Sequence, residues 1–137
     1  MTEKELELTA NHEIGHYLVA EHNGVAIDLV FIEADDTGFT RAATCHVKRN
    51  VALQIAVAGF VSEELSQGSD IRVENFLDKP QYDDDCNEAF SLMEGMRADI
   101  ALPHVISQVA EYLTSPDVAQ KRKELTQKLI KTRKLTF

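Results

Sequence analysis

Two histidines and a glutamate near the N-terminus have the residue types and the spacing of a zinc hydrolase site. The segment His12-Glu13-Ile14-Gly15-His16 places two imidazoles four residues apart. Because four residues of an α-helix turn through about 400°, the two rings point the same way and can reach one ion. Glu13 lies about 100° round the helix from His12, where it can contact a water held by the metal. Zinc lowers the pKa of such a water to about 7 and polarises a carbonyl group, so Glu13 is the candidate general base of a hydrolysis.

The setting of this motif favours a metal site over its alternative, two hydrogen-bonded histidines in an ordinary core. A chain of this length contains the pattern by accident about once in a few hundred cases. The motif also falls in a strongly helical segment, whose residues Tyr17, Leu18 and Val19 are apolar. Gly15 in mid-helix costs about 1 kcal/mol relative to alanine, so we expect another element to approach closely there.

A third metal ligand must come from elsewhere, since catalytic zinc sites usually take three protein ligands and keep one position for water. His22 follows His16 by six residues, as the third histidine of metzincins does, but Val19 stands where that pattern has glycine. On one continuous helix His22 lies about 120° away from the metal-facing side. The metzincin pattern is therefore only half matched.

Carboxylates are the other candidate ligands. The acidic triplet Asp83-Asp84-Asp85 stands beside a loop at the predicted start of a helix, so one of its carboxylates can swing towards a metal on another helix. Aspartates in a first helical turn are also favourable for the helix dipole alone. Glu63 and Glu64 are further candidates, which we expect mainly as hydrogen-bond partners of the ligands or as polar residues of a packing helix.

The apolar periodicity predicts a mainly α fold (α+β), with a small β-hairpin or meander, that positions these residues. Residues 1–137 are expected to form a single domain, because the chain has no internal repeat or low-complexity tract. The expected elements are a helix over 3–22, strands over 27–31 and 39–47 joined by a turn at 35–38, a helix over 51–65 that Asn50 caps and that ends near Gly68, a loop over 69–80, a helix from the acidic triplet to Met96, and helices over 103–113 and 116–134.

Composition restricts the possible partners and location. The formal net charge of −9 argues against a nucleic-acid partner. The absence of a signal peptide and of a long apolar run predicts a cytoplasmic protein without a membrane anchor, and Cys45 and Cys86 are expected to be reduced thiols that serve in packing. Seven of the fourteen basic residues lie between Lys121 and Lys134, where they form either a solvated helix face or a docking surface for an acidic partner.

Four segments, in the same order, resemble the peptidase domain of the FtsH family of membrane-bound, ATP-driven zinc proteases. The family's HEAGHA resembles HEIGHY at 12–17, with Ile14 and Tyr17 as departures, and its AGRxAEE is similar to AGFVSEE at 58–64, where Phe60 replaces arginine. The family's Gly-Tyr-Thr resembles Gly-Phe-Thr at 38–40. Its ND signature, with Ala and Met at fixed offsets, is similar to Asp84-Asp85 followed by Ala89 and Met96.

This resemblance implies a helical zincin-like peptidase domain that binds Zn²⁺ through His12, His16 and Asp85. It also implies that an extended peptide or unfolded protein substrate adds to a strand edge at 38–45. Members of the family assemble as hexamers, which implies a homo-oligomer. The sequence has no Walker motif, so a partner protein or an ATPase in trans would have to deliver folded substrates.

Three functions follow from these observations. The first is a zinc-dependent endopeptidase in which Glu13 is the general base. The second is a catalytically inactive, peptidase-like binding or regulatory module. The third is a helical adaptor whose basic C-terminal helix docks an acidic protein.

Overall fold

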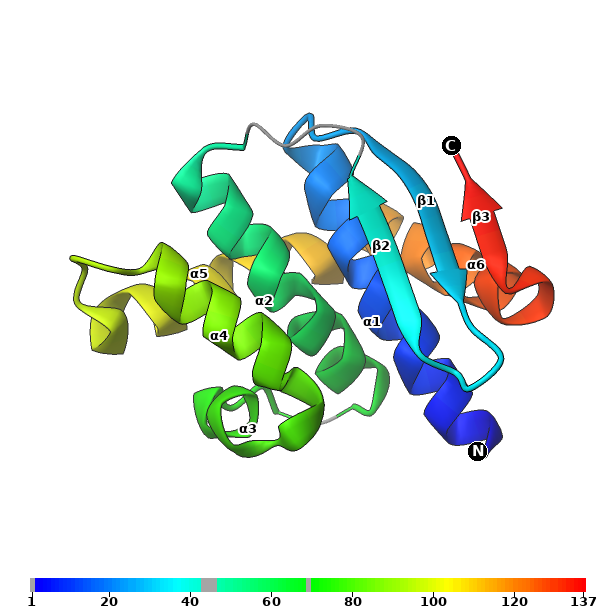
Figure 1. Ribbon diagram of the computed structural model, residues 1–137, viewed down its shortest axis with the longest axis horizontal. Helices are drawn as coiled ribbons and strands as arrows, with labels where there is room; N and C mark the ends of the chain where they lie inside the picture. The colour runs from blue at the N-terminus through cyan, green and yellow to red at the C-terminus, as the bar shows by residue number, and fades with distance from the viewer. Residues whose placement is uncertain (1, 43–46, 69) are drawn as a thin grey trace.

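The computed structural model describes residues 2–42, 47–68 and 70–137 and shows a small sheet packed against one side of a group of helices (Figure 1). The prediction of a mainly α (α+β) fold is confirmed. The elements in chain order are α1 (Glu3–His22), β1 (Ile27–Ile32), β2 (Gly38–Ala42), α2 (Arg49–Ser66), α3 (Val73–Asp78), the 3₁₀ helix η1 (Pro80–Tyr82), α4 (Asp83–Leu92), α5 (Ala98–Thr114), α6 (Pro116–Thr132) and β3 (Lys134–Thr136).

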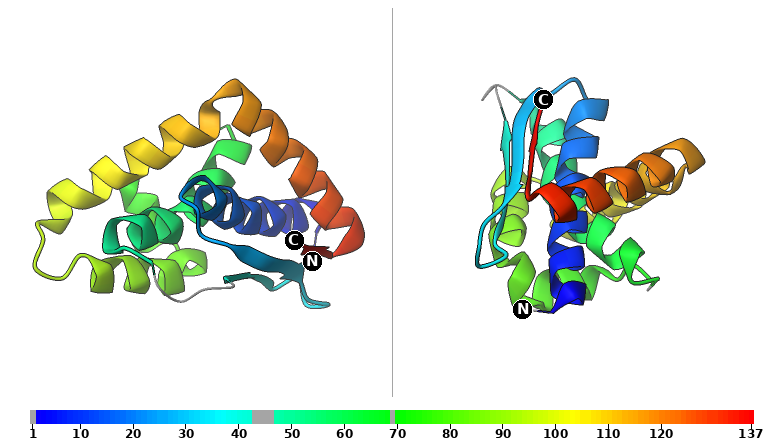
Figure 2. Two further views of the ribbon diagram at one scale, coloured as in Figure 1. Left: turned by 90° about the horizontal axis from the view of Figure 1, so that it is seen from above. Right: turned by 90° about the vertical axis from the view of Figure 1, so that its right-hand side faces the viewer.

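The elements form three layers, with α1 and α2 side by side in the middle. The sheet and α4 lie on one side of this pair, and α5 and α6 lie on the opposite side (Figure 2). Thr2 caps α1 by accepting a hydrogen bond from the Glu5 backbone N–H at 3.1 Å. Ala10, Ile14 and Leu18 of α1 are completely buried, as expected for a helix that is covered on more than one side.

Helix α2 approaches α1 very closely at Gly15, as its position in mid-helix predicted. A methyl group on Gly15 would lie 2.5 Å from the Ala58 carbonyl oxygen and 2.5 Å from the Ser62 Cβ. No residue larger than glycine fits there unless one helix moves. The glycine therefore sets the distance between the two central helices.

The sheet has three antiparallel strands in the order β2-β1-β3, and the third strand was not predicted. The prediction of a helix to residue 134 is wrong, because α6 ends at Thr132 and Arg133 takes a left-handed conformation with φ 63°. This residue turns the chain back, so that Leu135 pairs with Val30 of β1. Strand β2 pairs only with β1 in the described part of the chain, which leaves its outer edge open.

Several other boundaries differ from the predictions. The predicted loop over 69–80 contains α3 and the first residue of η1, and Phe76 and Tyr82 of these two helices are completely buried. Helix α4 ends at Leu92, before Met96. Helix α2 begins at Arg49 instead of after an Asn50 cap, with no side-chain cap bond.

Helix α5 begins at Ala98 and not at Pro103, which lies inside it. The carbonyl group that this proline leaves without an intrahelical partner belongs to Asp99, which is exposed to water.

Two predictions lie partly or wholly outside the described residues. The second strand was expected to reach residue 47, and β2 is described up to Ala42. The thiol of Cys45 is also outside the described part, whereas Cys86 is a free, partly buried thiol that packs against the core. Among the described helices, none combines the length and the apolar character needed to span a bilayer.

Gly15→Ala should lower the free energy of unfolding by about 1–3 kcal/mol. Alanine is the better helix former by about 1 kcal/mol, but its methyl group would collide with the Ala58 carbonyl group. Urea denaturation of the metal-free protein measures the change. Asn87→Ala, at an exposed position of α4, is the control and should raise stability slightly. A Gly15→Ala protein that is more stable than the native chain would contradict the close packing.

Candidate metal centre

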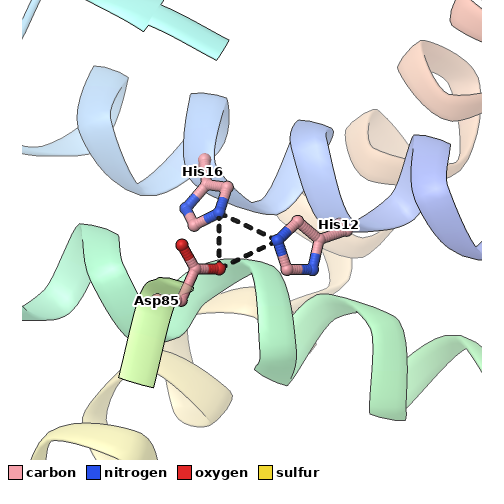
Figure 3. A group of neighbouring side chains, drawn as sticks. All are labelled: His12, His16 and Asp85. Carbon is pink, nitrogen blue, oxygen red and sulfur yellow. Dashed lines mark hydrogen bonds and ion pairs between the residues drawn. The ribbon is translucent and has the colours of Figure 1, made fainter. Parts of the chain in front are cut away.

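Three candidate ligands from two helices meet at one point. His12 and His16 extend from α1 towards Asp85, which extends from the first turn of α4 (Figure 3). The His12 Nε2 atom lies 3.2 Å from His16 Nε2 and 2.9 Å from Asp85 Oδ2, and the His16 Nε2–Asp85 Oδ2 distance is 3.2 Å. Tetrahedral zinc with ligand distances of about 2.0–2.1 Å holds its ligand atoms about 3.3 Å apart. The two imidazoles and the carboxylate therefore fit zinc in donor type and in spacing.

Each histidine ring has a partner on α2 at its other nitrogen. His16 Nδ1 donates to the Ile55 carbonyl oxygen of α2 at 2.6 Å. His12 Nδ1 lies 3.4 Å from Glu63 Oε1, also on α2. With both Nδ1 atoms acting as donors, loss of the Nε2 protons leaves lone pairs directed at the cluster, which is the usual arrangement of metal-binding histidines.

Gly59 of α2 lies directly beside the two rings. A methyl group on this residue would lie 2.6 Å from Nε2 of His12 and 2.6 Å from Nε2 of His16. Any side chain there would enter the space between the rings. Glycine at this position therefore keeps the ligand atoms accessible to an ion.

The site has a strongly negative electrostatic environment. Burial by itself would lower the pKa of His12, but hydrogen bonds to Asp85 and Glu63 outweigh burial and raise it to about 10. Burial would also lower the pKa of His16, but the charge of Asp85, its hydrogen bond and the charge of Glu13 together outweigh burial and raise it. Conversely, the two histidines outweigh burial at Asp85 and hold the pKa of its carboxyl group well below the usual range. The cluster thus favours positive charge, whether protons or a cation.

The candidate base Glu13 lies between the cluster and the sheet. Its side chain is almost buried, and its Oε1 accepts a hydrogen bond from the Thr40 hydroxyl of β2 at 2.7 Å. Its negative charge contributes to the raised pKa values of His12 and His16. Glu13 is therefore close to the ligands and is oriented by the strand that covers it.

An open cleft of about 810 Å³ exposes the cluster and Glu13. Its walls are formed by β2 and by α4, with α1 and α2 behind them. The lining includes the site residues described above, apolar residues, polar residues and two exposed acidic residues of α4. The apolar residues are Val25, Ile27, Phe39, Val47, Ala52, Ile55, Ala56 and Leu92, the polar ones include Thr9, Asp36, Thr37 and Gln81, and the acidic residues of α4 are Asp84 and Glu88. No lysine or arginine lines the cleft among the residues that the structure describes.

The remaining candidate ligands lie outside the cluster. His22 is exposed at the end of α1, where its ring stacks on Tyr112 with the centroids 4.0 Å apart. Glu64 is buried and accepts hydrogen bonds from Asn75 at 2.9 Å and from Lys79 at 3.3 Å. Asp84 lines the cleft without joining the ligand group, and Asp83 is exposed.

Sequence reasoning missed three features of the site. These are the Ile55 carbonyl group, the space beside Gly59, and Tyr82, whose hydroxyl group donates to Glu63 at 2.6 Å. A backbone carbonyl group has no sequence signal. Tyr82 did have one, because a large aromatic residue directly before an acidic triplet is a candidate for burial at the helix start.

The fold is a helical scaffold. Its cluster combines two histidines in the HExxH spacing with one carboxylate from another helix. No protein-family model matches this chain, and a search of curated proteins found no match. The function is therefore argued from the residues and their geometry.

Zinc should bind more tightly as the pH is raised from about 6 to about 9. The raised pKa values of His12 and His16 mean that the metal-free site holds protons at neutral pH, and these protons must leave before zinc binds. Competition with a chromophoric chelator at each pH measures the dissociation constant. His22→Ala is the control and should leave the constant unchanged. A pH-independent affinity of the native chain would contradict histidine ligation.

Proposed function

We propose that the chain is a zinc-dependent endopeptidase. The observation that carries this proposal is the convergence of Asp85 on the two motif histidines from a position 69 residues further along the chain. Glu13 lies beside the same cluster, and an open cleft gives a substrate access to both. Helix capping alone would account for an aspartate at the start of α4, but it would not direct the carboxylate onto two imidazole nitrogens.

His12, His16 and Asp85 would hold the zinc ion. Bound zinc supplies a Lewis acid that polarises the peptide carbonyl group and lowers the pKa of a water molecule to about 7. The Thr40 hydroxyl group donates to Oε1 of Glu13, and in the proposed reaction the carboxylate of Glu13 would accept a proton from the attacking water. The water oxygen bonds to the carbonyl carbon, the carbon–nitrogen bond breaks, and Glu13 transfers its proton to the departing amine.

The open edge of β2 supports an extended peptide as the substrate. Strand edges present unpaired N–H and C=O groups, with which a peptide pairs by adding a further strand. The edge of β2 borders the cleft at Gly38, Phe39 and Thr40. A peptide added there would cross the cleft beside Glu13 and would reach the apolar lining with one of its side chains.

The wider setting follows the FtsH resemblance. We expect the chain to hydrolyse flexible peptides directly and unfolded protein segments when an ATPase in trans supplies them. A homo-oligomer is part of the same proposal. We place the enzyme in the cytoplasm, where reduced cysteines such as Cys86 are usual.

Glu13→Gln should reduce peptide cleavage by at least about 100-fold, because general base catalysis contributes about 10²–10⁴-fold. The variant should still bind zinc, because Glu13 is not a ligand. Cleavage of a quenched fluorescent peptide and metal analysis of the same preparation measure the two quantities. Glu7→Gln, an equal change of charge at an exposed position of α1, should cleave as the native chain does.

Two outcomes of this experiment would contradict the proposal. Equal cleavage by the native chain and by Glu13→Gln would remove Glu13 from the mechanism. A native chain that binds zinc and peptides without cleaving them would instead identify a peptidase-like binding module.

Peptides with a lysine near the scissile bond should be cleaved faster than peptides with glutamate there. The exposed carboxylates of Asp84 and Glu88 face the cleft, which has no basic side chain in the described part of the chain. The double variant Asp84→Asn, Glu88→Gln should reduce the ratio of the two kcat/KM values by about three- to tenfold. Glu111→Gln with Glu124→Gln makes the same change of net charge at exposed positions outside the cleft and should not alter the ratio. An unchanged ratio in the Asp84 and Glu88 variant would contradict the role of these residues.

A further inference from the structure

Tyr82 is a completely buried residue at the junction between η1 and α4. Its ring packs edge-on against Phe60 of α2, with the centroids 5.0 Å apart, and lies near Phe76 of α3. Asp85 follows three residues later in the first turn of α4. The placement of Tyr82 in the core therefore determines where the helix carrying Asp85 begins.

The hydroxyl group of Tyr82 is directed at the metal centre. It donates to Glu63 Oε2 at 2.6 Å, and the other oxygen of the same carboxylate lies 3.4 Å from His12 Nδ1. The Tyr82 ring also lies parallel to the His12 ring, with an interplanar angle of 9° and a centroid distance of 6.0 Å. Tyr82 thus contacts the outer side of His12 both through its ring and through Glu63.

Glu63 depends on this hydroxyl group because its carboxylate is only 6% exposed. A buried carboxylate needs hydrogen-bond donors to offset the loss of water. Its other donors are more distant, since Gln81 Nε2 and His12 Nδ1 both lie 3.4 Å away. The short bond from Tyr82 therefore fixes the rotamer of Glu63, and Glu63 in turn fixes the direction of the His12 ring.

We infer that Tyr82 is a positioning residue of the zinc site, holding Glu63 so that His12 presents Nε2 to the ion beside Asp85. This inference rests on the proposed zinc site and adds a residue that never touches the metal. The resemblance to FtsH peptidases did not include Tyr82. Tyr82 connects the two arms of the site, because it holds the partner of His12 and also precedes the helix that carries Asp85.

The test compares the zinc dissociation constants of three variants with that of the native chain. Tyr82→Phe keeps the ring in the core and removes only the hydroxyl group, so it should weaken zinc binding by about tenfold. Glu63→Gln should weaken binding by a similar factor. The double variant should bind about as weakly as Glu63→Gln alone, because the hydroxyl group acts through Glu63.

Tyr17→Phe is a matched control, because the Tyr17 hydroxyl group also donates to a glutamate, Glu21, but lies outside the cleft. It should bind zinc as the native chain does. The visible absorption spectrum of the Co²⁺ form should change in Tyr82→Phe and not in Tyr17→Phe. Thermal unfolding of the metal-free variants separates positioning from stability. The double variant lacks the unpaired carboxylate, so it should be more stable than Tyr82→Phe. It should nevertheless still bind zinc weakly.

Three results with the variants would overturn the inference. The first is native zinc affinity in Tyr82→Phe. The second is that the effects of Tyr82→Phe and Glu63→Gln on zinc affinity multiply in the double variant. The third is that the double variant recovers native zinc affinity together with stability. A native chain that binds zinc without cleaving peptides would defeat the proposed endopeptidase and leave this inference standing. A native chain that binds no zinc would overturn the inference along with the site.

Discussion

The close contact between α1 and α2 is the constraint on which the metal site depends. The contact requires glycine on both helices, since Gly15 of α1 faces the Ala58 carbonyl group and Gly59 of α2 faces the histidine rings. At this separation the Ile55 carbonyl oxygen reaches His16 Nδ1. A wider spacing would remove that bond and free the ring to rotate. The helix spacing thus fixes the directions of the two histidine rings on one face of α1, which are the proposed ligands.

The third ligand comes from a helix that is attached separately to this pair. At its C-terminal end, the guanidinium group of Arg49 donates to the carbonyl groups of Leu92 and Glu94, where a cation is favourable for the helix dipole. At its N-terminal end, Tyr82 anchors the chain in the core immediately before α4. With both ends fixed, α4 has one orientation about its axis, and that orientation directs Asp85 at the histidines. The first turn of α4 therefore combines helix stabilisation with a candidate metal ligand.

Some parts of this arrangement could be predicted from the sequence. Others could not, for physical reasons. The direction of His12 and His16 follows from helix geometry alone, so their common face was predictable. The choice of Asp85 within the acidic triplet depends on the rotation of α4 against α2, which local periodicity does not encode; the FtsH resemblance supplied it. Strand β3 was missed because it has only three residues and pairs with β1, which lies far earlier in the chain. Helix α3 was missed because its burial depends on aromatic contacts with α2, such as the contact between Phe76 and Phe60.

Strand β2 links the position of a substrate to the position of the proposed base. The Thr40 side chain points from the strand towards α1 and holds Glu13, while the backbone edge of the same residues borders the cleft. A peptide that pairs with this edge is placed in register with Thr40, and hence at a set distance from Glu13. Proximity and orientation account for a large part of enzymatic rate enhancement, so a short strand that holds both partners would serve the proposed peptidase.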